Sequence, residues 1–105
     1  MILIHILTKD HAQALEISDF LVSKKLTVNA VILQNALVRK RDSSNQLISE
    51  NQTFVMGKTK ALLFNEIDRE LRDKYPSNMP VLYSVPIVNM DWDQTEKLVE
   101  QTTKV

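Results

Sequence analysis

The spacing of apolar residues changes several times along the chain, and each change predicts a new element. Residues 2–7 form a short, almost continuous apolar run, which is typical of a strand buried on both faces. Ala14, Ile17 and Leu21 then recur at helical spacing. Asp10 stands before this stripe with Gln13 three residues later, a pattern that resembles a capping box. We therefore expect a strand at 2–7, followed by a helix that starts at Asp10.

From Val28 the helical spacing gives way to a two-residue period. This alternation predicts a strand from Val28 to Arg41. Polar residues 42–45 are typical of a turn, and a second strand is predicted from Leu47 to Met56. Together the two strands would make a long hairpin.

A second helical stripe and another strand follow the hairpin. Thr59 is expected to cap the helix, whose apolar stripe ends at Tyr75 and which Pro76 stops. Residues 79–88 predict a fourth strand, and prolines at 80 and 86 favour a place at the edge of a sheet, where fewer amide donors are needed.

The last segment predicts a C-terminal helix. Asp91 would begin it, with Gln94 three residues later as a second capping pair. Residues 102–105 are expected to fray. The inner face of this helix is predicted to carry Trp92, Thr95, Leu98 and Val99.

The order β-α-β-β-α-β with a C-terminal helix predicts an α+β, ferredoxin-like sandwich. With 105 residues the chain is one domain, residues 1–105. A core this small has little margin, and oligomerisation would bury more surface per residue.

Charge and cysteine content exclude several function classes. Lys+Arg and Asp+Glu are both 13, so the net charge is zero, whereas a dedicated nucleic-acid binder is usually basic. No basic amphipathic segment points to a membrane surface. The chain has no cysteine, which excludes disulfides and thiolate sites. The first residues lack the basic stretch and cleavage site of a signal peptide, so we expect a cytoplasmic protein.

Four segments stand in an order that can be compared with known families. Lys58-Thr59 closes the hairpin, residues 75–80 read Tyr-Pro-Ser-Asn-Met-Pro, residues 81–87 form a strand ending in Pro-Ile, and Asp91-Trp92 opens the last helix. In order and spacing they resemble the CutA family, which is associated with tolerance of divalent cations and has a His-Pro-Tyr-Glu-x-Pro segment before its last long strand. The resemblance spans almost the whole chain.

The resemblance implies a non-enzymatic homotrimer in which the long hairpins pair with neighbouring subunits and so cover their strand edges. It also implies a link to divalent metal-ion tolerance or response, with copper as the expected cation. The family's ligands are nevertheless largely absent: Asn29 falls where the family has Cys, Tyr75 where it has His, Ser77-Asn78 where it has Tyr-Glu, and Val81 where it has Glu. Because thiolate, imidazole and carboxylate donors are replaced, we expect copper or another divalent cation to bind weakly or not at all.

Four residues are candidates for ligand binding. Arg39 and Arg41 share one face of their strand, and together with Lys58 they are candidates to hold an anion such as phosphate or a nucleotide. The alternative is that the two arginines belong to a solvated, aggregation-resistant hairpin tip. Lys58 occupies a cleft position of the family, although an ordinary lysine at a strand end would look the same. Asn29 stands at the family's Cys position. Gly57, the only glycine, indicates a bulge or a close backbone approach.

The chain does not resemble an enzyme. It has no Cys nucleophile and no Gly-rich phosphate loop. His5 is expected to be a partly buried strand residue and His11 a solvated residue at a helix start, and two histidines without further donors do not make a metal site. A small-molecule or anion sensor of the PII-like kind, or a scaffolding trimer that binds a partner protein, remains the alternative, because the fold alone does not choose among functions.

Overall fold

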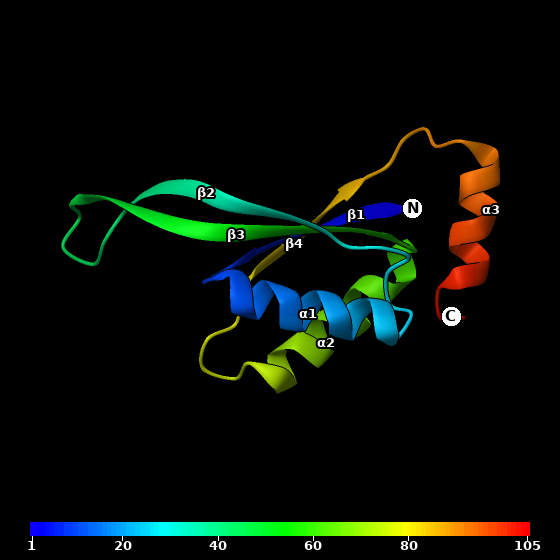
Figure 1. Cartoon of the computed structure of the whole chain (residues 1–105), viewed down its shortest axis with the longest axis horizontal. Helices are drawn as coiled ribbons and strands as arrows, with labels where there is room; N and C mark the ends of the chain where they lie inside the picture. The colour runs from blue at the N-terminus through cyan, green and yellow to red at the C-terminus, as the bar shows by residue number, and fades with distance from the viewer.

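An antiparallel sheet, three α-helices and one short 3-10 turn make up the structure, a computed structural model that describes residues 1–105. In chain order the elements are β1 (Ile2–Thr8), α1 (His11–Ser23), β2 (Val31–Arg41), β3 (Leu47–Thr59), η1 (Ala61–Leu63), α2 (Phe64–Lys74), β4 (Val81–Pro86) and α3 (Trp92–Gln101). The predicted ferredoxin-like order with a C-terminal helix is confirmed (Figure 1). No helix is long and apolar enough to span a membrane.

The four strands lie in the order β2-β3-β1-β4, so β4 is an edge strand as predicted. Helices α1 and α2 cover one face of the sheet, while α3 lies beyond one end of it (Figure 1). The core forms where the predicted stripe of α1 meets the inner face of β1. Its fully buried members include Ile4, Ile6, Ala14, Ile17, Leu21, Val55, Ile67 and Leu71.

The second face of the sheet carries no helix, and this corrects the expectation for β1. Its residues alternate, with Ile2, Ile4, Ile6 and Thr8 buried but Leu3, His5 and Leu7 only partly buried. Burial on both faces was therefore wrong for the single chain. The run in the sequence is nearly continuous because both faces of β1 carry mostly apolar side chains. Helices cover only one of these two faces.

The hairpin of β2 and β3 extends well past the rest of the sheet (Figure 1). Strand β1 pairs with β3 only from Thr53 to Thr59, whereas β2 and β3 pair with each other out to Arg41 and Leu47. The predicted turn closes the hairpin, because Asp42 Oδ1 accepts hydrogen bonds from Ser44 N at 2.8 Å and Gln46 N at 3.0 Å. We call residues 36–52 the outer hairpin.

Two boundaries of the hairpin differ from the predictions. Strand β2 begins at Val31 rather than Val28, and β3 continues to Thr59. Thr59 therefore does not cap a helix. Its side chain is fully buried on the inner face of the sheet, where its hydroxyl donates to the carbonyl of Leu26, and η1 follows without a side-chain cap. Burial of this hydroxyl with a partner satisfies a polar group that would otherwise be costly.

The C-terminal region also differs from the predictions. Only Leu98 of α3 is buried, and Trp92 and Val99 are 71% and 46% exposed. The residues after α3 do not fray at once, because Thr102 is buried and Thr103 N donates to Lys25 O at 2.8 Å. The ordered tail anchors a helix that has little apolar contact of its own.

Candidate functional site

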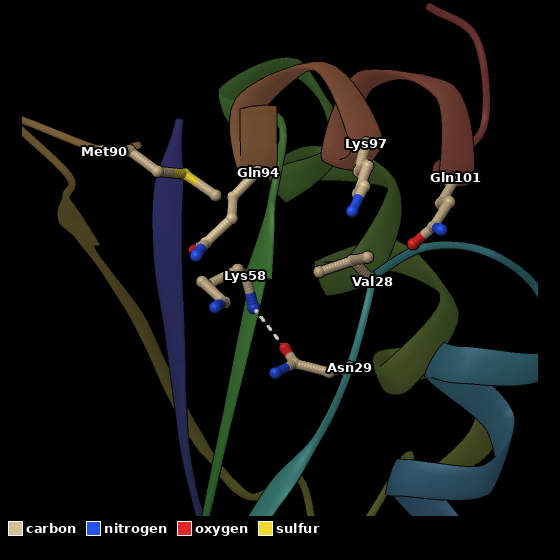
Figure 2. Close-up of a pocket in the computed structure, with 7 residues that line it drawn as sticks. All are labelled: Val28, Asn29, Lys58, Met90, Gln94, Lys97 and Gln101. Carbon is tan, nitrogen blue, oxygen red and sulfur yellow. Dashed lines mark hydrogen bonds between the residues drawn. The ribbon is translucent and has the colours of Figure 1, made fainter. Parts of the chain in front are cut away.

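A small cavity opens where the end of β3, the segment before β2 and helix α3 come together. Its volume is about 230 Å³. Figure 2 shows its lining, which consists of Val28, Asn29, Lys58, Met90, Gln94, Lys97 and Gln101. Lys58 and Asn29, two of the four candidates from the sequence, thus lie at one site.

Gly57 allows the two strands of chain at this site to approach each other. A Cβ atom at residue 57 would lie 2.9 Å from Asn29 O, closer than two such atoms can pack. The predicted close backbone approach is therefore confirmed. The approach is fixed by hydrogen bonds from Val28 N to Lys58 O at 2.9 Å and from Lys58 N to Asn29 Oδ1 at 3.4 Å.

Helix α3 supplies the opposite wall. Gln94, Lys97 and Gln101 are three and four residues apart, so they share one helix face. In Figure 2 their side chains reach from α3 toward Lys58 on β3 and the segment before β2 that carries Asn29. The predicted cap fixes the start of the helix, because Asp91 Oδ2 accepts from Gln94 N at 3.1 Å.

The cavity is positively charged within a chain that is neutral as a whole. Its lining includes two lysines and no acidic residue. Ion pairs occur elsewhere, between Lys40 and Glu50, Arg69 and Glu66, Arg72 and Asp68, and Lys74 and Glu16. Lys58 and Lys97 take part in none of them.

The other two candidates lie at the far end of the hairpin. Arg39 and Arg41 share a face as predicted, opposite Ser49 and Leu47. Ser49 is nine residues along β3 from Lys58, roughly 30 Å at the rise of an extended strand. Within one chain the arginines therefore do not join Lys58 in one site, and anion binding by them stays a prediction.

The histidines lie apart from this cavity. His5 is partly buried as predicted, between the rings of Phe54 and Tyr83, with Nδ1 3.2 Å from Tyr83 Oη. His11 is exposed at the start of α1, where its Nδ1 lies 2.8 Å from Gln34 Nε2.

The residues present do not fit a divalent cation. No group of three or more His, Cys, Asp or Glu side chains in the chain is arranged to hold a metal ion. The cavity at Asn29 offers amides, ammonium groups and a thioether, none of which is the carboxylate, imidazole or thiolate that such cations prefer.

Tyr75, at the position where the resemblance places the family's His, has a hydrogen-bond partner on α1. Its hydroxyl donates to Glu16 Oε1 at 2.6 Å, and Lys74 Nζ lies 3.5 Å from the same oxygen. The hydrogen bond from Tyr75 holds the pKa of Glu16 below its ordinary value, with a smaller contribution from Lys74. Burial, together with the Glu16 carboxylate, raises the pKa of Tyr75. This contact joins α1 to the end of α2.

Comparisons with known proteins identify the architecture. No protein-family model and no curated protein sequence matches the chain. Solved structures do. CutA1 from Oryza sativa matches with a TM-score of 0.90 at 13% identity, over 99% of this chain and 94% of that one. The chain has the CutA fold.

Two further CutA structures match over nearly their whole length. The divalent cation tolerance protein from Thermus thermophilus has a TM-score of 0.88 at 18% identity, over 98% of this chain and 100% of its own. The periplasmic divalent cation tolerance protein CutA from Archaeoglobus fulgidus has a TM-score of 0.86 at 19% identity, over 96% and 98%. The resemblance expected from the segment order is confirmed for the CutA fold, and the three matches cover 96–99% of the chain.

Proposed function

We propose that this chain is a non-enzymatic, homotrimeric protein of the CutA type with a scaffolding role in the cellular response to divalent cations. The CutA fold supports the type, and two of the matching structures are of proteins named for divalent cation tolerance. The observation that carries the proposal is the apolar face of the sheet that no helix covers.

The side chains on this helix-free face are mostly apolar, with Lys58 at one end opposite Leu3. The face contains the half-buried or exposed side chains of Leu3, His5, Leu7, Val31, Leu33, Phe54, Met56, Val81, Tyr83 and Val85. Val31, Leu33 and Val81 are 44%, 50% and 53% exposed. A contiguous apolar patch of this kind marks an interaction surface. Further copies of the same chain would bury it and enlarge a small core.

The outer hairpin gives a second reason for assembly. It is a two-stranded ribbon, because β1 pairs with β3 only from Thr53 onward. Such a ribbon is marginally stable alone, and its free edges are open to pairing. Leu37 and Leu47, both about two-thirds exposed, lie on it. In the proposed trimer a neighbouring subunit covers these edges and side chains.

The proposed role in cation response does not run through a metal centre of the chain, because the donor set does not fit a divalent cation. We propose instead that the trimer acts by binding a partner protein or a small anion. We also propose a cytoplasmic location.

Native mass spectrometry tests the assembly with a matched pair of variants. Leu33→Asp introduces a charge into the helix-free face, and Leu15→Asp introduces the same charge on α1, where the leucine is similarly exposed (43% against 50%). We expect trimers for the unaltered protein and for Leu15→Asp, but folded monomers for Leu33→Asp. A monomeric unaltered protein would overturn the proposal.

The same spectra test the metal. After incubation with copper(II) or zinc and removal of the excess, we expect less than one ion per trimer. Uptake of one or more copper or zinc ions per trimer would show a cation site that these residues do not predict. The proposed function would then have to include metal binding.

A further inference from the structure

The cavity at the end of the sheet holds two positive charges without a partner. Lys58 lies on β3 and Lys97 on α3, and both line a space of about 230 Å³. Lys97 has Asp93 one turn before it and Glu100 one turn after it, positions suited to helix ion pairs. Neither carboxylate lies within ion-pair distance of Lys97, and no acidic group enters the cavity. An anion placed in the cavity would be attracted by both ammonium groups.

The polar side chains around the lysines are also free to bind. Asn29 accepts from Lys58 N through its oxygen, which leaves its amide N–H groups available as donors. Gln94 and Gln101 line the same wall as Lys97, and their side chains make no hydrogen bond within the chain. Figure 2 shows these carboxamides and the two lysines arranged around one space. Ammonium and amide donors around one cavity are the groups that recognise oxyanions.

Size and charge narrow the class of ligand. The cavity is smaller than the roughly 300–1,000 Å³ of pockets that take drug-sized molecules. Its two apolar residues, Val28 and Met90, leave little surface for an aromatic base. The absence of carboxylates makes it unfavourable for cations.

We propose that the Lys58–Lys97 cavity binds a small oxyanion with at least two negative charges, such as a phosphate group or a di- or tricarboxylate. This site rests on the proposed function, since it gives the small anion named there a place and a chemical class. A single chain supplies the whole lining of the cavity. Lys58 and Lys97 neutralise the anion, while Asn29, Gln94 and Gln101 donate to its remaining oxygens.

Isothermal titration calorimetry in a low-salt buffer without oxyanions tests the proposal, with inorganic phosphate and citrate as separate probes. We expect at least one probe to bind, and the preferred probe distinguishes a phosphate ligand from a carboxylate ligand. Lys58→Gln and Lys97→Gln should each weaken binding by about tenfold or more, because each removes a charge-assisted hydrogen bond. Added sodium chloride should weaken binding further, since it screens exposed charges.

Lys24→Gln is the matched control, because it removes one exposed positive charge at the C-cap of α1 from a residue that does not line the cavity. We expect its affinity to equal that of the unaltered protein. Side-chain amide signals of Asn29, Gln94 and Gln101 should shift in NMR spectra on addition of the binding probe. The proposal is overturned if neither probe binds, if the control loses as much affinity as the cavity variants, or if these amide signals do not move. Native mass spectra of the same samples show whether each variant still forms a trimer, so that a loss of anion binding can be distinguished from a loss of assembly.

Discussion

The contact between Tyr75 and Glu16 shows how one hydroxyl sets the charge behaviour of a surface residue. Glu16 titrates with a pKa below its ordinary value of 4.5, chiefly because it accepts the hydrogen bond from Tyr75. A carboxylate whose pKa is lower in the folded state stabilises the fold above its unfolded pKa. That stabilisation is lost as the pH falls through the folded pKa.

Tyr75→Phe therefore has a pH-dependent effect. We expect the pKa of Glu16 to rise toward 4.5 in this variant, with a remaining depression from Lys74. The loss of stability relative to the unaltered protein should be larger at pH 7 than at an acidic pH below the folded pKa of Glu16, where this carboxyl is protonated in both proteins. Carboxyl carbon NMR titration measures the pKa, and urea unfolding at the two pH values measures the stability.

Tyr83→Phe provides the control for this prediction, because it removes another tyrosine hydroxyl, one that lies beside His5 on the far face of the sheet. It should leave the Glu16 titration unchanged. An unaltered Glu16 pKa in Tyr75→Phe would mean that Lys74, not the hydroxyl, holds it down.

The sequence could identify two of the seven residues that line the candidate cavity. Lys58 and Asn29 stood out through their positions in the family pattern, and Gly57 as the only glycine. Lys97 and Gln101 gave no such signal, because polar residues on a helix usually face water. Only the docking of α3 against the end of the sheet turns that helix face toward Lys58.

At the scale of elements, α3 depends on its polar tail more than on its apolar face. Leu98 is its only buried side chain. Lys60 Nζ donates to the carbonyls of Thr102 at 3.3 Å and Thr103 at 2.9 Å. Thr103 in turn bonds to the backbone after α1. These bonds hold the helix that forms one wall of the cavity.

Lys60→Met should therefore loosen α3 while leaving the sheet intact. The variant keeps the length of the side chain but loses both hydrogen bonds to the tail. We expect faster hydrogen exchange at the amides of residues 92–101, with no change in the amides of β1. Lys104→Met, which alters an exposed lysine of the same tail, should behave like the unaltered protein. Equal exchange in the two variants would mean that Leu98 alone anchors the helix.

Element types followed from apolar spacing, but the faces of some elements did not. The helical period in α1 predicted its buried stripe correctly, because this helix packs against the inner face of the sheet in the core. Trp92 and Val99 suggested an inner face for α3, yet that helix lies beyond the end of the sheet and has room to bury only one apolar residue. The apolar run in β1 predicted two covered faces, whereas one chain provides helices for only one of them. The spacing of apolar residues in the sequence predicts the type of element. Which face of that element is buried depends on its position in the tertiary structure.

At the scale of the whole molecule, the apolar helix-free face and the outer hairpin point to the same assembly. One chain leaves both surfaces uncovered, and strands β2 and β3 contribute to both of them. If three chains fold and associate together, unfolding releases three separate chains. The stability of the trimer must then depend on protein concentration, whereas the stability of a monomer does not.

Thermal unfolding over a hundredfold range of concentration measures this dependence. For a trimer that unfolds to single chains, each tenfold rise in concentration adds about 0.9 kcal/mol per chain. That increment corresponds to a rise in Tm of about 4–7 °C for a domain near this size. Leu33→Asp should unfold at a lower temperature that does not change with concentration, because its copies no longer associate. Leu15→Asp should keep the slope of the unaltered protein even if its Tm shifts. A concentration-independent Tm for the unaltered protein would contradict the trimer and would leave the apolar face to be covered by a different partner.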